Sequence, residues 1–383
     1  MLQNGFRPFF LGGASLAPVA LALWVAALSG RIEIPSAFGP LLWHQHEMLF
    51  GYAGAIIAGF ALTAIPNWTG RLPIGGWPLV ALSGLWFAGR LAVVASELVG
   101  AGLALVLDVG FLGTLAALVL REIASGRNWR NLPVAALLTG LALANLLTHL
   151  EPALGLGTAE LGIRLGLAAV LILIGLIGGR VTPSFTRNWL VKQGQEILPA
   201  PFGRFDLLAL ALLVVALLAW AVAPDAVPAA ALLSVAGALH LLRLARWRGT
   251  RTAAEPLVLI LHVGYGWLAL GLLLLGLEGL GLLPIPLAAL HALTAGAIGT
   301  MTLAVMTRAS LGHTGRPLTA GRLTVLIYVL VVAGSLLRVV APALPASALL
   351  LMLASLLWGG AFLLFVAGYG PMLGRRSVDP GGA

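Results

Sequence analysis

The stretch Trp43-His44-Gln45-His46-Glu47 begins a long apolar run, MLFGYAGAIIAGFALTAIPNW, which ends at Thr69-Gly70-Arg71. Arg71 lies 25 residues after His46, and the same spacing separates His291 from Arg316. Such a run can cross a bilayer as a helix, which needs about 20 apolar residues. Ionisable side chains are costly at a membrane boundary, and imidazole is the commonest protein ligand for transition metals. The stretch therefore predicts membrane-spanning helices that hold a metal site.

The composition extends this prediction to the whole chain. The 383 residues are 60% hydrophobic and 9% charged, with a mean hydropathy of +1.03, whereas a soluble domain carries about 25% charged residues. The alternating strands of about ten residues that build an outer-membrane barrel are not found in the sequence. The net charge of +9 does not indicate nucleic acid, because the arginines lie in short loops between apolar runs and act as topology signals.

Apolar runs bounded by Pro, Gly or charge predict an all-α polytopic integral membrane protein with one transmembrane domain over residues 1–383. The apolar run from Leu11 lacks a small-residue cleavage site and is interpreted as a retained first helix rather than a signal peptide. The predicted spans number twelve and cover residues 10–29, 44–66, 77–96, 101–121, 132–150, 161–183, 205–223, 227–247, 255–277, 285–307, 321–341 and 346–369.

The basic residues predict the orientation of these spans. With a cytoplasmic N-terminus, eighteen fall on the cytoplasmic side, three fall on the opposite side, and Arg90 lies within a span. Both termini are therefore predicted to be cytoplasmic. The cytoplasmic group is Arg7, Arg71, Arg121, Arg127, Arg130, Arg180, Arg187, Lys192, Arg204, Arg243, Arg246, Arg248, Arg251, Arg308, Arg316, Arg322, Arg375 and Arg376, and the opposite group is Arg31, Arg164 and Arg338.

Two parts of the chain resemble each other after a shift of 245 residues. Between residues 46 and 95, fourteen of fifty aligned pairs are identical, including His46 with His291, and Thr69-Gly70-Arg71 with Thr314-Gly315-Arg316. A fainter similarity joins Pro66-Asn-Trp-Thr69 to Pro183-Ser-Phe-Thr186. The pattern predicts four-helix internal repeats, which in membrane proteins often place a functional site between the repeated parts.

The chain has no cysteine, so disulfides, iron–sulfur clusters and covalently attached c-type haem are excluded. A metal would be held by His, Met, carboxylate or backbone, and any haem would be non-covalent. From the rise of 1.5 Å per helical residue, the seven histidines divide into two depths. The outer set is His44, His46, His149 and His291, and the inner set is His240, His262 and His313.

All seven histidines are candidate metal ligands. His44 and His46 point about 200° apart on a regular helix, so they share a metal only if the helix begins between them. Glu47 is then a partner of the ligands, a proton acceptor or an oxygen ligand, and it is the candidate catalytic residue. His262 and His291 are flanked by glycines that could give a flat macrocycle clearance.

Several of these residues have simpler interpretations. A lone histidine in a span is often only hydrogen-bonded, which applies most to His149 and His240, and His313 could be interfacial. Glycines such as Gly51 could serve only close helix packing. Arg90 and Asp108 could pair with each other. The arginines next to span ends could hold anionic groups such as haem propionates or only set orientation, and these are Arg71, Arg187, Arg308 and Arg316.

Long motifs across nearly the whole chain resemble the NnrS family of bacterial membrane proteins. They are Phe6-Arg7-Pro8-Phe9-Phe10, residues 43–51, residues 66–71, residues 178–188, residues 261–265 and residues 306–316. The resemblance implies non-covalent haem b, copper, twelve spans, the bacterial inner membrane, and protection against nitric oxide during denitrification or nitrosative stress. It does not say which histidines bind haem and which bind copper.

Two classes of function remain open, with a weaker third. The first is a haem–copper protein that binds, detoxifies or reduces nitric oxide, in the last case as an oxidoreductase resembling nitric oxide reductase, with electrons from an external donor. The second is a transporter or carrier of a metal, an iron–nitrosyl species or a small anion. The third is a sensor or assembly factor that protects metal centres. The first is favoured because histidines outnumber the intramembrane carboxylates, on which coupled transport usually depends.

Overall fold

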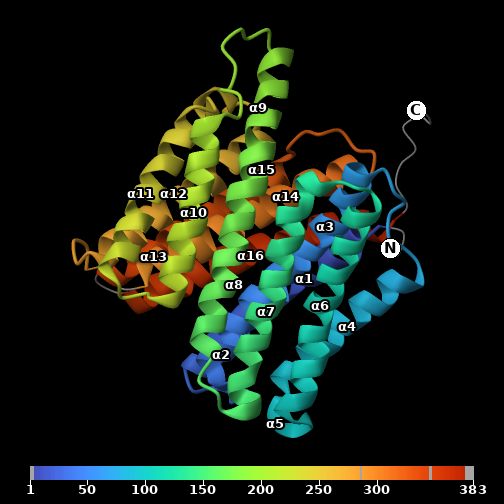
Figure 1. Ribbon diagram of the computed structural model, residues 1–383, viewed down its shortest axis with the longest axis vertical. Helices are drawn as coiled ribbons and strands as arrows, with labels where there is room; N and C mark the ends of the chain where they lie inside the picture. The colour runs from blue at the N-terminus through green and yellow to red at the C-terminus, as the bar shows by residue number, and fades with distance from the viewer. Residues whose placement is uncertain (1–3, 285–286, 345–346, 376–383) are drawn as a thin grey trace. The chain divides into compact units, whose positions relative to one another are not determined.

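The computed structural model describes residues 4–284, 287–344 and 347–375, and all regular secondary structure in these ranges is helical (Figure 1). Within these ranges, twelve helical spans are long and apolar enough to cross a membrane. The predicted all-α multi-pass membrane fold is therefore confirmed. The predicted starts at residues 285 and 346 lie outside the described residues, as does Arg376.

The helical elements follow one another with short connections. The α-helices are α1 (Phe6–Leu28), α2 (Gly39–His46), α3 (Gly54–Thr69), α4 (Trp77–Val94), α5 (Ser96–Val99), α6 (Ala101–Ser125), α7 (Leu132–Leu154), α8 (Ala159–Leu173), α9 (Gly179–Lys192), α10 (Arg204–Val222), α11 (Val227–Ala245), α12 (Pro256–Gly279), α13 (Ala288–His291), α14 (Gly299–His313), α15 (Arg322–Val340) and α16 (Ser347–Gly374). The π-helices are η1 (Glu47–Ala53), η3 (Ile174–Gly178) and η5 (Ala292–Ile298), and the 3-10 helices are η2 (Trp129–Asn131), η4 (Gly249–Thr252) and η6 (Ala341–Ala343).

Three spans differ clearly from their predicted bounds. The second begins at Gly39 rather than at residue 44, because Pro40 in the first turn suits a helix start. The sixth continues through Pro183 to Lys192, and the tenth continues to His313. The polar ends of these helices, which hydropathy assigned to loops, are helical in the structure.

Each of these three spans contains a π-helix, in which a widened turn displaces the side chains from regular α-helical positions. Such turns are rare and frequent at functional sites. η1 and η5 begin 245 residues apart, which is the shift at which the sequence matches itself. The internal repeat and the membrane orientation stay predictions.

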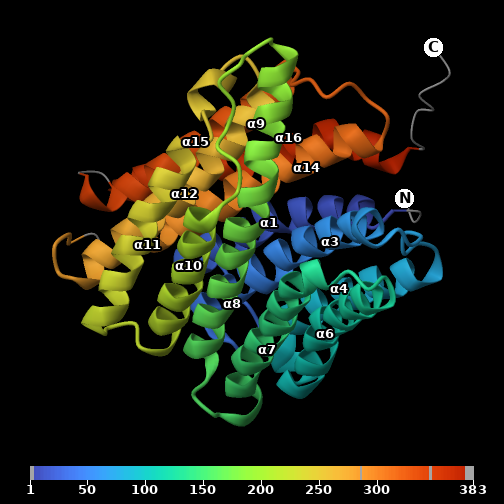
Figure 2. The same ribbon diagram turned by 45° about the horizontal axis from the view of Figure 1, so that its top comes forward.

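The described residues form two compact units. Unit 1 contains residues 4–170, 313–315 and 366–375, and unit 2 contains residues 171–284, 287–312, 316–344 and 347–365. In unit 1, α6 packs against α4 and α7, and α1 packs against α3. In unit 2, α11 lies between α10 and α12 (Figure 2). A single domain over the whole chain stays a prediction.

The start of α1 shows how unit 1 is closed at one end. Phe6 and Phe10 are buried with their ring centroids 5.9 Å apart, and Phe9 packs against Phe111 of α6 at 5.7 Å. Arg7 is also buried, and its Nη1 donates a hydrogen bond of 2.8 Å to the carbonyl of Leu373 in α16. The motif that begins α1 therefore anchors the C-terminal end of α16 within the same unit.

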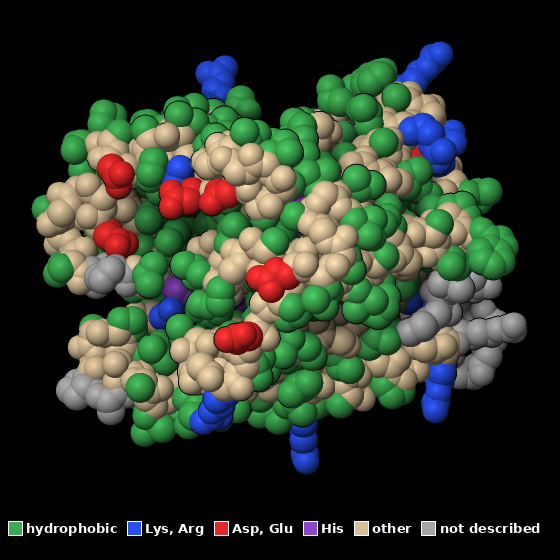
Figure 3. All heavy atoms as spheres, turned by 90° about the horizontal axis from the view of Figure 1, so that it is seen from below, with side chains coloured by type: hydrophobic (Ala, Val, Ile, Leu, Met, Phe, Trp, Pro, Cys, Tyr) green, Lys and Arg blue, Asp and Glu red, His purple; other side chains and the backbone are tan. Residues whose placement is uncertain are grey.

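Large apolar side chains are exposed along the helices. Leu103, Val106 and Leu363 are 49%, 64% and 56% exposed. Figure 3 shows hydrophobic side chains over much of one face, with several Lys and Arg side chains projecting outward. Exposure of so much apolar surface to water is unfavourable, whereas contact with lipid chains is not. The surface therefore agrees with a protein that spans a membrane several times.

Candidate metal centre

Six buried polar side chains meet inside unit 1, and we call them the Asp108 cluster. They come from four spans: His46 and Glu47 lie where α2 passes into η1, Arg90 lies on α4, Asp108 on α6, and Asn145 and His149 on α7. Each is at most 6% exposed. Buried polar groups are expected to be hydrogen-bonded, and most polar atoms of this cluster are, although Arg90 Nε and His149 Nδ1 have no hydrogen-bond partner.

Asp108 is the hub of the cluster. Its Oδ2 accepts hydrogen bonds from Asn145 Nδ2 at 2.8 Å and from His149 Nε2 at 2.9 Å, and it lies 3.0 Å from His46 Nε2. Its Oδ1 forms an ion pair with Arg90 Nη2. The predicted pairing of Arg90 with Asp108 is therefore confirmed.

Arg90 also holds the second carboxylate. Its Nη1 donates to Glu47 Oε1 at 2.7 Å, and the same oxygen lies 3.2 Å from His46 Nδ1. Gly51 in η1 makes this approach possible, because a Cβ at that position would lie 2.5 Å from Arg90 Nη1. Gly51 thus has a definite role beside the cluster, in addition to helix packing.

The cluster lacks one positive charge. With neutral imidazoles, the carboxylates of Glu47 and Asp108 face the single guanidinium of Arg90, which leaves one negative charge in a buried site. Uncompensated buried charge is strongly unfavourable. The hydrogen bonds indicate the same deficit, because both ring nitrogens of His46 face oxygens while a neutral imidazole carries only one N–H. A proton on His46 or on one of the carboxylates, or a metal cation, would complete the cluster.

Three ligand atoms are close enough to hold such a cation. One atom each from His46, Asp108 and His149 lies within 4.8 Å of the others, and all three residues are buried. The Nδ1 of His149 is buried with no hydrogen-bond partner. Two imidazoles and a carboxylate form a donor set that suits copper, iron or zinc.

His44 does not join His46 in this cluster. Because α2 begins at Gly39, both residues lie within a helix, where positions two apart point in different directions. His44 instead stacks on Trp24, with ring centroids 4.9 Å apart. The helix start between them that would let both bind one metal is not present, because α2 begins at Gly39.

A second buried cluster lies in unit 2, and we call Asp206, His240, Arg243 and Tyr265 the Asp206 cluster. Arg243 Nε donates to Asp206 Oδ1 at 2.8 Å, and Arg243 Nη1 donates to the Tyr265 hydroxyl at 2.7 Å and to the Gly175 carbonyl at 3.1 Å. Arg243 approaches the backbone after η3 closely, since a Cβ at Gly179 would lie 2.6 Å from its Nη1 and Nη2.

The hydrogen bonds of His240 leave it no free nitrogen. Its Nε2 lies 3.1 Å from the Ala209 carbonyl, so this nitrogen carries the proton. Its Nδ1 lies 2.7 Å from the Tyr265 hydroxyl, which donates to it while accepting from Arg243. His240 is therefore a hydrogen-bonded histidine in this structure, in agreement with the simpler interpretation of its sequence position.

His262 lies near this cluster but does not belong to it. Its Nε2 is 2.8 Å from Thr186 Oγ1, its Nδ1 is buried with no partner, and its ring contacts Trp247 edge-on at 6.3 Å. Side chains already fill the clearance that its neighbouring glycines could give. A Cβ at Gly264 would lie 2.8 Å from Met301, and one at Gly249 would lie 2.5 Å from His262 itself.

A comparison with protein families found a match that extends over the described residues of both units. The family model described as NnrS protein matches residues 1–376. The chain belongs to the NnrS family. This membership supports a membrane protein of the nitric oxide response. A search of curated proteins found no match.

The remaining predicted residues of this NnrS-family chain lie apart from the two clusters. His291 is half-buried in unit 2, with its Nδ1 2.7 Å from the Leu287 carbonyl, and His313 packs against Phe6 in unit 1 at 5.6 Å. Arg187 is exposed, and Arg308 lies over the ring of Phe185 at 3.9 Å. Arg316 Nη1 is buried with no hydrogen-bond partner. As ligands of a metal or an anion, these residues stay predictions.

Several cluster members were not predicted from the sequence of this NnrS-family protein. Asn145 lies four residues before His149, and Arg243 lies three residues after His240, so each shares a helix face with a predicted histidine. That spacing could have identified both residues. Asp206 and Tyr265 reach the cluster from other helices, and nothing local in the sequence marks them.

Proposed function

We propose that this protein binds copper at His46, Asp108 and His149 and uses the bound metal to bind nitric oxide. The observation that carries the proposal is the buried Asp108 cluster, in which one ligand atom each from His46, Asp108 and His149 lies within 4.8 Å of the others. Imidazole and carboxylate ligands also suit iron and zinc. Copper is preferred because of the family resemblance.

The other cluster residues would serve the metal site through their charges and hydrogen bonds. Asn145 and Arg90 hold the Asp108 carboxylate in place, and such partners of a ligand typically alter metal affinity about 10–100-fold. Glu47 lies 3.2 Å from His46 Nδ1 and is proposed to accept or pass a proton. Copper would supply the centre at which nitric oxide binds, and turnover as an oxidoreductase would need an external electron donor.

The residues around His262 do not fit a haem in this structure. Trp247 and Thr186 lie beside its ring, and Met301 fills the space next to Gly264. The expected haem therefore stays a prediction of the resemblance, and no chemical step is assigned to it.

The test compares the proposed ligands His46 and His149 with a control, His44, which lies two residues before His46 on the same helix. Copper, iron and zinc would be measured by mass spectrometry in the purified full-length wild type and in His46→Ala, His149→Ala and His44→Ala. We expect copper in the wild type and in His44→Ala, with occupancy at least about tenfold lower in the other two variants. Nitric oxide should change the absorption spectrum of the reduced wild type and of His44→Ala alone.

Two outcomes would sink the copper proposal. One is a wild type without copper, and the other is loss of copper in His44→Ala equal to that in His46→Ala. Metal analysis that finds iron or zinc instead would keep the site and change its metal.

A transporter is the second candidate function. It is favoured by the π-helices inside three spans and by buried ionisable groups, since transporters often place irregular helices and charges at their substrate sites. Exchange of a metal or small anion across proteoliposomes that contain the purified protein would support transport. Tightly bound copper without exchange would favour the first proposal.

A further inference from the structure

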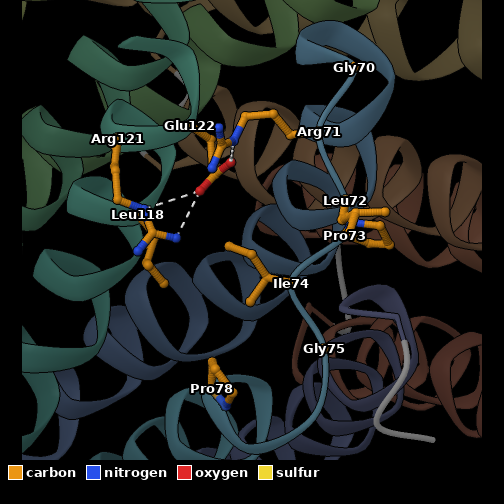
Figure 4. Close-up of a pocket in the computed structure, with 10 residues that line it drawn as sticks. All are labelled: Gly70, Arg71, Leu72, Pro73, Ile74, Gly75, Pro78, Leu118, Arg121 and Glu122. Carbon is orange, nitrogen blue, oxygen red and sulfur yellow. Dashed lines mark hydrogen bonds and ion pairs between the residues drawn. The ribbon is translucent and has the colours of Figure 1, made fainter. Parts of the chain in front are cut away.

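A pocket opens where the loop after α3 passes the C-terminal end of α6 in unit 1 (Figure 4). Its volume is about 600 Å³. Arg71, Arg121 and Glu122 line one part, and apolar side chains that include Ile74, Pro78 and Leu118 line another. It is separate from the Asp108 cluster, none of whose residues line it.

The ion pairs of this pocket leave an excess positive charge. Glu122 is 4% exposed, and its Oε2 accepts from Arg71 Nε while its Oε1 accepts from Arg121 Nε and Nη2 at 3.1 and 2.8 Å. Two guanidinium groups therefore face one carboxylate. Each guanidinium has five N–H donors, so donors remain on both after these bonds are made.

The backbone holds the two arginines in position. Gly70 ends α3 with a φ of 70°, a left-handed conformation that glycine adopts readily, and the chain turns there so that Arg71 reaches Glu122. Asn128, which follows α6, donates to the Trp68 carbonyl near the end of α3. The ends of both helices are thus joined, and the arginines are positioned before a ligand binds.

We propose that this pocket binds the phosphate headgroup of an anionic phospholipid. Arginine matches the geometry of phosphate oxygens, and basic pockets between membrane helices bind acidic lipid headgroups. The predicted orientation places this end of α3 and α6 at the cytoplasmic surface.

The apolar surroundings favour a lipid over a free anion. Leu72 in the same pocket is 89% exposed, and the adjacent Trp77 is 84% exposed. Exposed tryptophan is typical of membrane interfaces. A free phosphate would use the arginines but leave these apolar side chains in water, whereas the glycerol and acyl groups of a lipid would cover them.

The test measures phosphatidylglycerol bound to the purified full-length protein by native mass spectrometry, with phosphatidylcholine as the neutral reference. Arg121→Gln leaves Glu122 paired with Arg71 and should lower phosphatidylglycerol binding about fivefold. Glu122→Gln removes the negative charge and should raise it. Arg130→Gln removes an exposed charge outside the pocket and should leave it unchanged.

Lower phosphatidylglycerol binding in Arg121→Gln together with higher binding in Glu122→Gln would show that these residues act on the lipid through their charge. A purely structural role would lower lipid binding in both variants. Equal binding by wild type, Arg121→Gln and Glu122→Gln would overturn the proposal. Displacement of phosphatidylglycerol by inorganic phosphate at matched concentration would identify a free-anion site and overturn the lipid assignment. None of these results depends on copper at the Asp108 cluster.

Discussion

The Asp108 and Asp206 clusters use similar side chains in two different ways. Each buries an aspartate against an arginine, with histidine nearby, and each arginine approaches a glycine of a π-helix or of the turn that follows it. In the Asp206 cluster the buried Arg243 and the partly exposed Arg246 both pair with Asp206, so no negative charge is left over, and every nitrogen of His240 is bonded. In the Asp108 cluster Glu47 adds a second carboxylate, and two histidines face one oxygen of Asp108.

If the Asp108 cluster binds a metal as we propose, its excess negative charge, rather than its residue types, separates it from the Asp206 cluster. A buried network whose carboxylate is already paired with arginine does not need a cation to compensate it. A network that lacks one positive charge favours binding of a cation. Mutations that remove a charge, fill the space beside Arg90 or remove one hydroxyl should therefore change stability and copper content differently in the two clusters.

The largest effect is expected from Asp108→Ala. The change leaves Arg90 buried with only Glu47 as a carboxylate partner, and breaking a buried ion pair costs about 3–5 kcal/mol. Asp206→Ala should cost about as much, because Arg243 loses its partner. Thermal unfolding in detergent would show both losses, but only Asp108→Ala should also remove copper. Equal loss of copper in both variants would contradict the distinction between the clusters.

A smaller effect is expected from Gly51→Ala, which forces Arg90 to move because the new Cβ would lie 2.5 Å from its Nη1. Overpacking of this kind costs about 1–3 kcal/mol. Gly54→Ala is the matched control in the same span, since its Cβ would lie 3.5 Å from Leu112, an ordinary contact. The melting temperature should fall in the first variant and change little in the second. A similar fall in both would mean that helix packing alone explains these glycines.

The smallest effect is expected from Tyr265→Phe, which removes one hydroxyl between Arg243 and His240. Loss of these hydrogen bonds should cost about 1–2 kcal/mol in unfolding free energy. Copper content should be unchanged, because the carboxylate of the Asp206 cluster is already paired with Arg243 and Arg246. A fall in copper together with stability would show that the two clusters are coupled.

The sequence predicted more of the fold than of the sites. Twelve spans followed from hydropathy, although His44 and Lys192 lie within helices whose ends were placed too far inward. His46 and His149 were assigned to one depth, and a pairing of Arg90 with Asp108 was considered as a simpler interpretation. All four residues belong to the Asp108 cluster. The partners Asn145, Asp206 and Tyr265 were missed.

The sequence by itself determined the helices, because an apolar segment in lipid must satisfy its backbone hydrogen bonds internally, and only length and hydropathy are needed to recognise it. Tertiary packing decided which polar side chains meet. Asp108 contacts His46, 62 positions before it, and His149, 41 positions after it. His240 on α11 contacts Tyr265 on the next helix, α12. A local pattern does not encode such contacts, because they depend on how whole helices pack and where π-helices turn their side chains.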